Sequence, residues 1–216
     1  LIRFSTQENP FQWIPTATNT AGDLRLSKGS EIITAVQTSR QILVYTDQSL
    51  YSMQFLGPPF TFGISQIAEG TTIRGINAAV AINDAVYWMG VDRFYLYDGR
   101  VQPIPCTVKD HVFNDFDAAN SQKVIAGRNS AYGEVVWYYP SESGGTGEND
   151  RYVIYNYAED VWSYGQLERT AWLDTGVQAF PVAAKDNYIY QHEIGFNDDG
   201  NPMTNVFIES SDFDLG

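Results

Sequence analysis

The sequence has very little cysteine and no long hydrophobic run. Its one cysteine, Cys106, cannot pair within the chain, which excludes the disulfide-stapled class of secreted domains and fits synthesis in a reducing cytoplasm. No stretch of about 18 apolar residues is present, so we expect no membrane-spanning helix. The sequence has no initiator methionine and no signal peptide, and it opens within an alternating strand pattern, so that both ends look cut from something longer. We therefore expect a fragment of a longer chain.

Basic residues are also scarce. Thirteen Lys and Arg residues stand against 26 Asp and Glu, which gives a net charge of −13. Such a surface repels phosphate backbones and anionic lipids, so we expect neither ordinary nucleic-acid binding nor docking on a membrane surface, and no membrane insertion. The same charge favours solubility and would suit a wall along which a polyanion passes without binding.

The residue patterns of common catalytic and metal sites are missing. His111 and His192 are the only histidines and do not have metal-ligand spacing, and no nucleophile elbow or phosphate-binding glycine loop occurs. Cys106 follows Pro105 with no basic residue within two positions, so we interpret it as a packing thiol. The sequence predicts no catalytic residue, no cofactor and no metal ion.

Carboxylates form the most suggestive groups. Three lie close together in one segment, and two more lie in a second: Asp110, Asp115 and Asp117, then Asp198 and Asp199. A glycosidase needs two carboxyl groups about 5–10 Å apart across a sugar. The second group is, however, part of an Asn-Asp-Asp-Gly-Asn run that is typical of a hairpin turn, and it lacks the spacing of a calcium loop.

Aromatic side chains are abundant, and they recur in hairpins. Aromatics make up 14% of the chain, which favours strands. An apolar-aromatic strand, a polar turn and a second strand repeat four times, near residues 42–55, 85–99, 134–156 and from 187 onward. The starts at 42, 85, 134 and 187 are 43, 49 and 53 residues apart, an interval typical of four-stranded propeller blades. We predict an all-β, β-propeller-like domain over residues 1–216, with inner strands at 31–36, 76–82, 123–127 and 180–184.

Two segments depart from this pattern. Residues 107–118 place Val108, Val112 and Phe116 at helical spacing, which predicts one short helical insert capped by Thr107. Residues 141–148 are rich in Ser and Gly and predict a flexible hairpin tip. A parallel βαβ fold is the weaker alternative, because it needs a helix between each pair of strands.

Five residues are the candidate partner contacts. Trp88, Trp137 and Trp162 lie in strand patterns and are expected in the core. The candidates lie instead in an apolar turn and in less regular segments: Pro58, Pro59, Phe60, Trp13 and Trp172.

Several segments together resemble virion structural proteins of tailed bacteriophages. They span nearly the whole chain: residues 9–13, 21–30, 51–60, 86–90, 150–157, 161–163 and 169–174. The resemblance implies a role similar to that of nozzle or DNA-stabilisation proteins of short-tailed phages, which form rings at the DNA exit and contain propeller-like domains. It implies a longer parent chain, made in the host cytoplasm and placed in the virion tail, and it supplies no catalytic residues.

Three functions remain open. In the first, the chain is a tail component that acts by assembly with copies of itself and other tail proteins, with DNA passing nearby. In the second, it is a carbohydrate-binding propeller on a host-facing surface, which predicts exposed Trp or Tyr. In the third, it is a propeller glycoside hydrolase, which predicts converging carboxylates; the sequence disfavours this function most.

Overall fold

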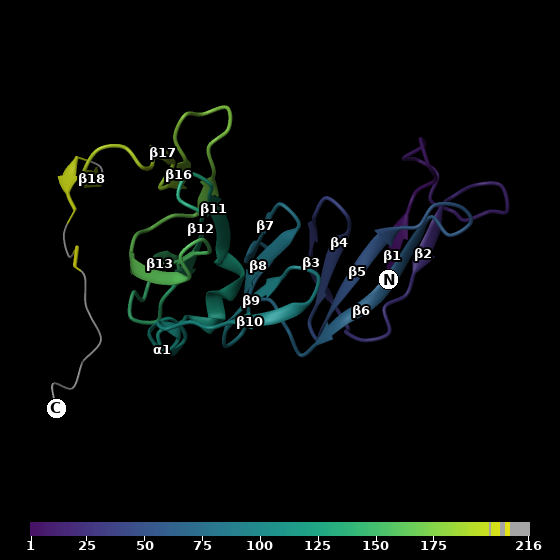
Figure 1. Ribbon diagram of the computed structural model, residues 1–216, viewed down its shortest axis with the longest axis horizontal. Helices are drawn as coiled ribbons and strands as arrows, with labels where there is room; N and C mark the ends of the chain where they lie inside the picture. Colours follow the sequence, from purple (N-terminus) through teal and green to yellow (C-terminus); the bar gives the residue numbers. More distant parts are fainter. Residues whose placement is uncertain (199, 204–205, 208–216) are drawn as a thin grey trace.

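The computed structural model describes residues 1–198, 200–203 and 206–207, and most of them belong to antiparallel strands (Figure 1). The prediction of an all-β fold is confirmed. In the described part of the chain, no helix has the length and apolar character needed to cross a bilayer.

Three four-stranded sheets form the body of the molecule, and each runs up and down in sequence order. The first contains β3 Ile32–Gln37, β4 Ile42–Thr46, β5 Ser49–Phe55 and β6 Phe62–Glu69. The second contains β7 Ala79–Ile82, β8 Ala85–Met89, β9 Phe94–Tyr97 and β10 Val101–Ile104. The third contains β11 Ile125–Asn129, β12 Glu134–Pro140, β13 Asn149–Asn156 and β14 Val161–Gln166.

Smaller sheets flank this body. A fourth sheet has three strands, β15 Ala171–Leu173, β16 Val182–Lys185 and β17 Tyr188–Gln191. Near the N-terminus, β1 Ile2–Phe4 pairs with β2 Gly22–Leu24, and near the other end β18 Asn197–Asp198 pairs with β19 Asn201–Pro202. Side chains of the β1–β2 segment pack against Val44, Tyr51 and Met53 of the first sheet.

The repeat is more regular than the sequence pattern indicates. The first strands β3, β7, β11 and β15 begin at residues 32, 79, 125 and 171, which are 47, 46 and 46 residues apart. The prediction of a fourth inner strand at 180–184 is wrong, because β16 is the second strand of its sheet and β15 contacts β11. In the sequence, the β15–β16 loop separates the short first strand β15 from the aromatic residues at 188–191. The aromatic pattern therefore did not indicate β15.

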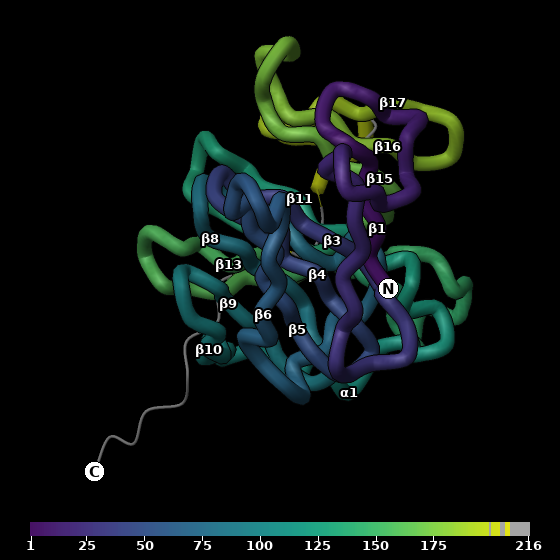
Figure 2. The backbone as a smooth tube through the Cα atoms, turned by 90° about the vertical axis from the view of Figure 1, so that its right-hand side faces the viewer, coloured from purple at the N-terminus to yellow at the C-terminus, as the bar shows by residue number. Residues whose placement is uncertain are grey.

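The four first strands lie next to one another along the molecule (Figures 1 and 2). β3 contacts β7, β7 contacts β11, and β11 contacts β15, while Ala126 N donates to Asn77 O at 2.7 Å. The β1–β6 region lies at one end of the long axis and the β13–β17 region toward the other, so the described residues form an open array (Figure 1). Closure into a propeller stays a prediction.

Large aromatic side chains fill the space between sheets. Tyr45, Trp88 and Trp137 occupy corresponding positions in the second strands of three sheets, and all three are completely buried. Trp137 Nε1 donates to Ala78 O at 3.1 Å, which ties the third sheet to the second. The predicted core positions of Trp88 and Trp137 are confirmed, while Trp162 is half-buried and donates to Pro105 O.

The helical insert lies where it was expected, between the second and third sheets. It consists of α1 Lys109–Asn114 and a 3₁₀ helix, η1 Ala118–Lys123. The predicted cap at Thr107 is wrong: Val108 is the N-cap residue and no side chain caps α1. Asp117 caps η1 instead, accepting from Ala119 N and Asn120 N.

The Ser/Gly-rich loop between β12 and β13, which the sequence predicts to be a flexible hairpin tip, makes specific hydrogen bonds. Asp150 accepts from Ser141 N at 2.8 Å and from Ser141 Oγ at 2.7 Å. Asp115 accepts from Ser143 N and Oγ, and Lys123 donates to Gly147 O. Composition alone could not reveal these partners, because Asp115 and Lys123 come from the helical insert.

Candidate functional site: a groove and an apolar apex

An open groove follows the first strands of all four sheets. It encloses about 500 Å³ and is lined by Thr34, Ala35, Val36, Gln37, Ile76, Asn77, Ala79, Ile125, Ala126, Thr170, Ala171 and Trp172. Each first strand contributes an alanine, and the small side chains keep the groove open. No lining residue carries a charge. The groove therefore suits an uncharged ligand and disfavours an ion.

Charge is distributed very unevenly along the chain. Residues 1–104 contain 7 basic and 8 acidic residues, a net charge of −1. Residues 105–216 contain 6 basic and 18 acidic residues, a net charge of −12. The acidity of the whole chain is thus a property of its second half.

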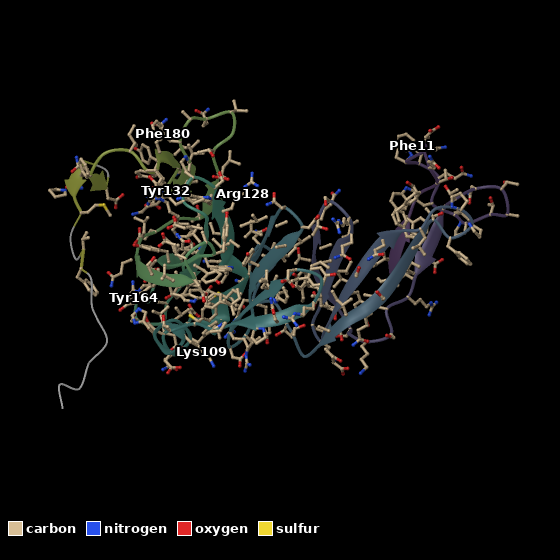
Figure 3. The ribbon with its side chains drawn as sticks, viewed as in Figure 1. Phe11, Lys109, Arg128, Tyr132, Tyr164 and Phe180 are labelled. Carbon is tan, nitrogen blue, oxygen red and sulfur yellow. The ribbon has the colours of Figure 1, made fainter. Side chains whose placement is uncertain are left out.

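A second uncharged surface, which we call the apex, lies at the β1–β6 end of the molecule. It comprises the loop of residues 9–21 and the β5–β6 hairpin tip, which meet where Thr61 Oγ1 donates to Thr20 O at 3.2 Å. Six large apolar side chains are exposed there: Phe11, Trp13, Ile14, Phe55, Leu56 and Phe60. Phe11 is 91% exposed and Phe60 is 71% exposed, and Figure 3 shows Phe11 at the end of the long axis. Residues 9–22 and 48–68 contain no charge.

The backbone of the apex bonds within itself. Leu56 N donates to Thr61 O, and Phe60 N donates to Gly57 O, both at 3.0 Å. Trp13 Nε1 donates to Pro10 O at 2.6 Å. These three donors need no water, so covering the apex would not leave them unpaired.

Four of the five predicted contact residues fall on the apex. Trp13, Pro58, Pro59 and Phe60 are all exposed there. Trp172 lies elsewhere, on β15 at the edge of the groove, where its Nε1 donates to Arg128 O at 2.8 Å. A Cβ atom on Gly127 would lie 2.2 Å from Trp172 Cδ1, so this indole packs tightly between the third and fourth sheets.

The carboxylates noted in the sequence do not come together. Asp115 binds Ser143, Asp117 caps η1, and Asp198 pairs with Arg169. Asp199 lies outside the described residues, and among those that are described none bonds to the Asp110 carboxylate. Among residues that the structure describes, no three His, Cys, Asp or Glu side chains are grouped as metal ligands.

Two other carboxylates, those of Glu134 and Glu193, share one amide donor. Asn129 Nδ2 donates to Glu193 Oε1 at 3.0 Å and to Glu134 Oε2 at 3.4 Å. Burial and the nearby Glu193 raise the pKa of Glu134. The two acids lie 59 positions apart in the sequence, so no local pattern could have indicated the pair.

A buried cation, Arg169, directly precedes the groove residue Thr170 in the sequence. Arg169 is only 4% exposed; its Nε donates to His192 Nε2 at 2.8 Å and its Nη2 lies 3.3 Å from Asp198 Oδ1. The guanidinium also stacks 4.5 Å from the centre of the Tyr190 ring. Burial, and then the charge of Arg169, lower the pKa of His192 to about 4, so the ring is neutral and can accept the bond.

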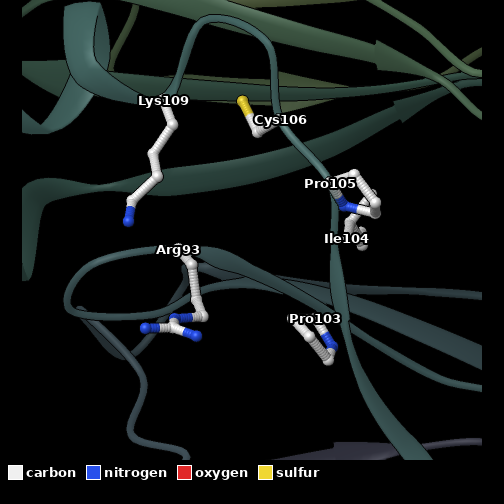
Figure 4. Close-up of a pocket in the computed structure, with 6 residues that line it drawn as sticks. All are labelled: Arg93, Pro103, Ile104, Pro105, Cys106 and Lys109. Carbon is white, nitrogen blue, oxygen red and sulfur yellow. The ribbon is translucent and has the colours of Figure 1, made fainter.

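Cys106 borders a small pocket of about 200 Å³ (Figure 4). Lys109 and Arg93 also line it, and Arg93 is engaged by Asp92 at 2.6 Å. Burial raises the pKa of the Cys106 thiol to about 11. Little thiolate exists near neutral pH, which agrees with the interpretation of Cys106 as a packing residue.

Comparison of the sequence with protein-family models finds no match, and comparison with the curated proteins finds none either.

Proposed function

We propose that this chain is a structural component of a bacteriophage tail, located in the virion and working by assembly with copies of itself and other tail proteins. The observation that carries the proposal is the apex: six large apolar side chains grouped on an uncharged surface near one end of an acidic molecule. Exposed apolar patches of this kind are typical of protein interaction sites. The proposal involves no catalytic step and no cofactor.

Features outside the apex also favour assembly over function as a single copy. The repeated sheets form an open array, and the fourth sheet exposes Tyr188 and Ile189 on its last strand. In the first three sheets the third strands are buried or half-buried, apart from the last two residues of β5. The acidic second half of the chain would let DNA pass nearby without binding to it.

Electron microscopy tests this proposal. The protein would be imaged, and its mass in solution measured, alone and together with other tail proteins of the same particle. A closed ring of several copies with an axial channel is expected. Dispersed monomers in the presence of those partners would contradict the proposal.

Carbohydrate binding is the second candidate, because the groove combines an indole with uncharged polar side chains. Trp172 lies near Thr170 at one part of the lining, and Gln37 and Asn77 contribute amides. Saturable binding of a host glycan, weakened by the exposed-site variant Gln37→Ala, would favour this function. Absence of binding to cell-surface glycans of the host would rule out this second function.

A further inference from the structure

The apex and the groove are both uncharged surfaces, and they lie apart. The groove follows the first strands, whereas the apex ends the long axis (Figures 1 and 3). One copy therefore cannot fill its own groove with its own apex. We propose that the β5–β6 hairpin tip of one copy, residues 55–60, inserts into the groove of a second copy. This proposal names the contact surfaces of the assembly proposed above and rests on that function.

The charge distribution favours contact between the tip and the groove over contact between two acidic second halves. Two acidic second halves, each with a net charge of −12, repel one another, so contact between those halves is disfavoured. The tip and the groove lining carry no charge, and neither requires an ion to lose its water on contact. The groove also borders the first sheet, which belongs to the nearly neutral first half of the chain.

The size of the groove and the preorganisation of the tip also support this contact. The groove volume of about 500 Å³ is enough for a few side chains but not for a folded domain. Pro58 and Pro59 restrict the backbone of the tip, and the Leu56–Thr61 and Phe60–Gly57 bonds close it. A tip that is already ordered loses little entropy on binding, which favours affinity.

The contact would be heterologous, because a tip meets a groove and not another tip. Each copy in such a contact keeps one free tip or one free groove, so copies add until a ring closes. This geometry distinguishes the proposal from a two-fold dimer made of two apices.

Two variants separate the two surfaces. Phe60→Asp places a charge on the tip, and Ala35→Asp places one in the groove; both positions are exposed, so both variants should fold. We expect each variant alone to raise the dissociation constant for self-association by about 30-fold or more, measured by sedimentation equilibrium. Val177→Ser is the matched control, since it removes a fully exposed apolar side chain that belongs to neither surface. Unchanged melting temperatures would verify folding.

Mixing the variants gives the decisive result. The Phe60→Asp chain keeps its groove and the Ala35→Asp chain keeps its tip, so an equimolar mixture should form a 1:1 complex and nothing larger. If Phe60→Asp alone abolishes association while Ala35→Asp has no effect, the contact joins two apices and the inference is overturned. Wild-type chain that stays monomeric at all concentrations also overturns it, although rings formed with other tail proteins would leave the proposed function standing.

Neutral phosphatidylcholine vesicles are the last arm of the test. We expect wild-type chain to remain unbound in a flotation assay. Flotation that is lost in Phe60→Asp and retained in Ala35→Asp would assign the apex to a lipid surface and overturn the inference.

Discussion

At the scale of single residues, the contacts around Arg169 show how a buried cation is kept in an acidic protein. Its guanidinium has one carboxylate partner, Asp198, and one imidazole partner, His192. The imidazole accepts only while it is neutral, so folding is coupled to the protonation of His192.

We therefore expect stability to fall as the pH is lowered from about 6.5, the usual pKa of histidine, towards about 4. The folded-state pKa is lowered, so the unfolded chain binds the proton first and the neutral ring's contribution is lost over that range. After allowance for solvent screening of this partly exposed ring, the loss is about 1–2 kcal/mol. Urea unfolding at several pH values measures it.

His192→Gln should remove this part of the pH dependence, because an amide can accept from Arg169 Nε without titrating in this range. His111→Gln serves as the control and should keep the parent profile. An identical pH profile for His192→Gln and the parent would show that the Arg169 contact does not govern acid stability.

At the scale of elements, the close approach of β11 and β15 depends on a residue without a side chain. Gly127 on β11 lies against the Trp172 indole, which leaves no room for a methyl group. The fourth sheet contacts β11 through β15, so this junction holds it to the array.

Gly127→Ala should destabilise the chain by about 1–3 kcal/mol, because the new Cβ atom forces the indole or the strand to move. Thermal or denaturant unfolding followed by tryptophan fluorescence measures this loss. Gly176→Ala is the control, since no atom lies within 4 Å of its Cβ position. If the double variant Gly127→Ala/Trp172→Leu recovers part of the lost stability, the effect lies at this contact. Equal stability of Gly127→Ala and Gly176→Ala would contradict the prediction.

The loop between β12 and β13 gives a second test at this scale. Asp150→Ala removes the acceptor of both Ser141 bonds, so we expect faster cleavage by a glutamate-specific protease after Glu142 and Glu148. Asp110→Ala, an exposed acid on α1, should leave the cleavage rate unchanged. Equal rates in parent and Asp150→Ala would mean that the other bonds suffice to hold the loop.

Sequence reasoning succeeded where local pattern decides structure. The hairpin turns at Asn83 and at Asp186–Asn187 have positive φ values, which their residue types tolerate, and the aromatic strands around them were predicted. It failed at β15, a three-residue strand without an aromatic-rich pattern of its own. The Arg169–His192 contact and the Asn129-linked acids join distant segments, so only tertiary structure could reveal them.

At the scale of the whole molecule, the partition of charge controls how copies approach one another. Self-association through the tip and the groove gains nothing from ionic attraction and is opposed by the acidic second halves. Added salt screens that repulsion over a Debye length of about 10 Å at 0.1 M.

We therefore expect self-association to strengthen as sodium chloride is raised from low to moderate concentration. Sedimentation velocity across a salt series measures the change. Association that weakens with salt would indicate an ionic interface and would contradict an uncharged one.

The division into a neutral half and an acidic half also makes the molecule a strong electric dipole. In the field of any polyanion, the acidic end turns away and the apex turns towards the source. Orientation would then precede contact, so a polyanion could align this chain without binding it.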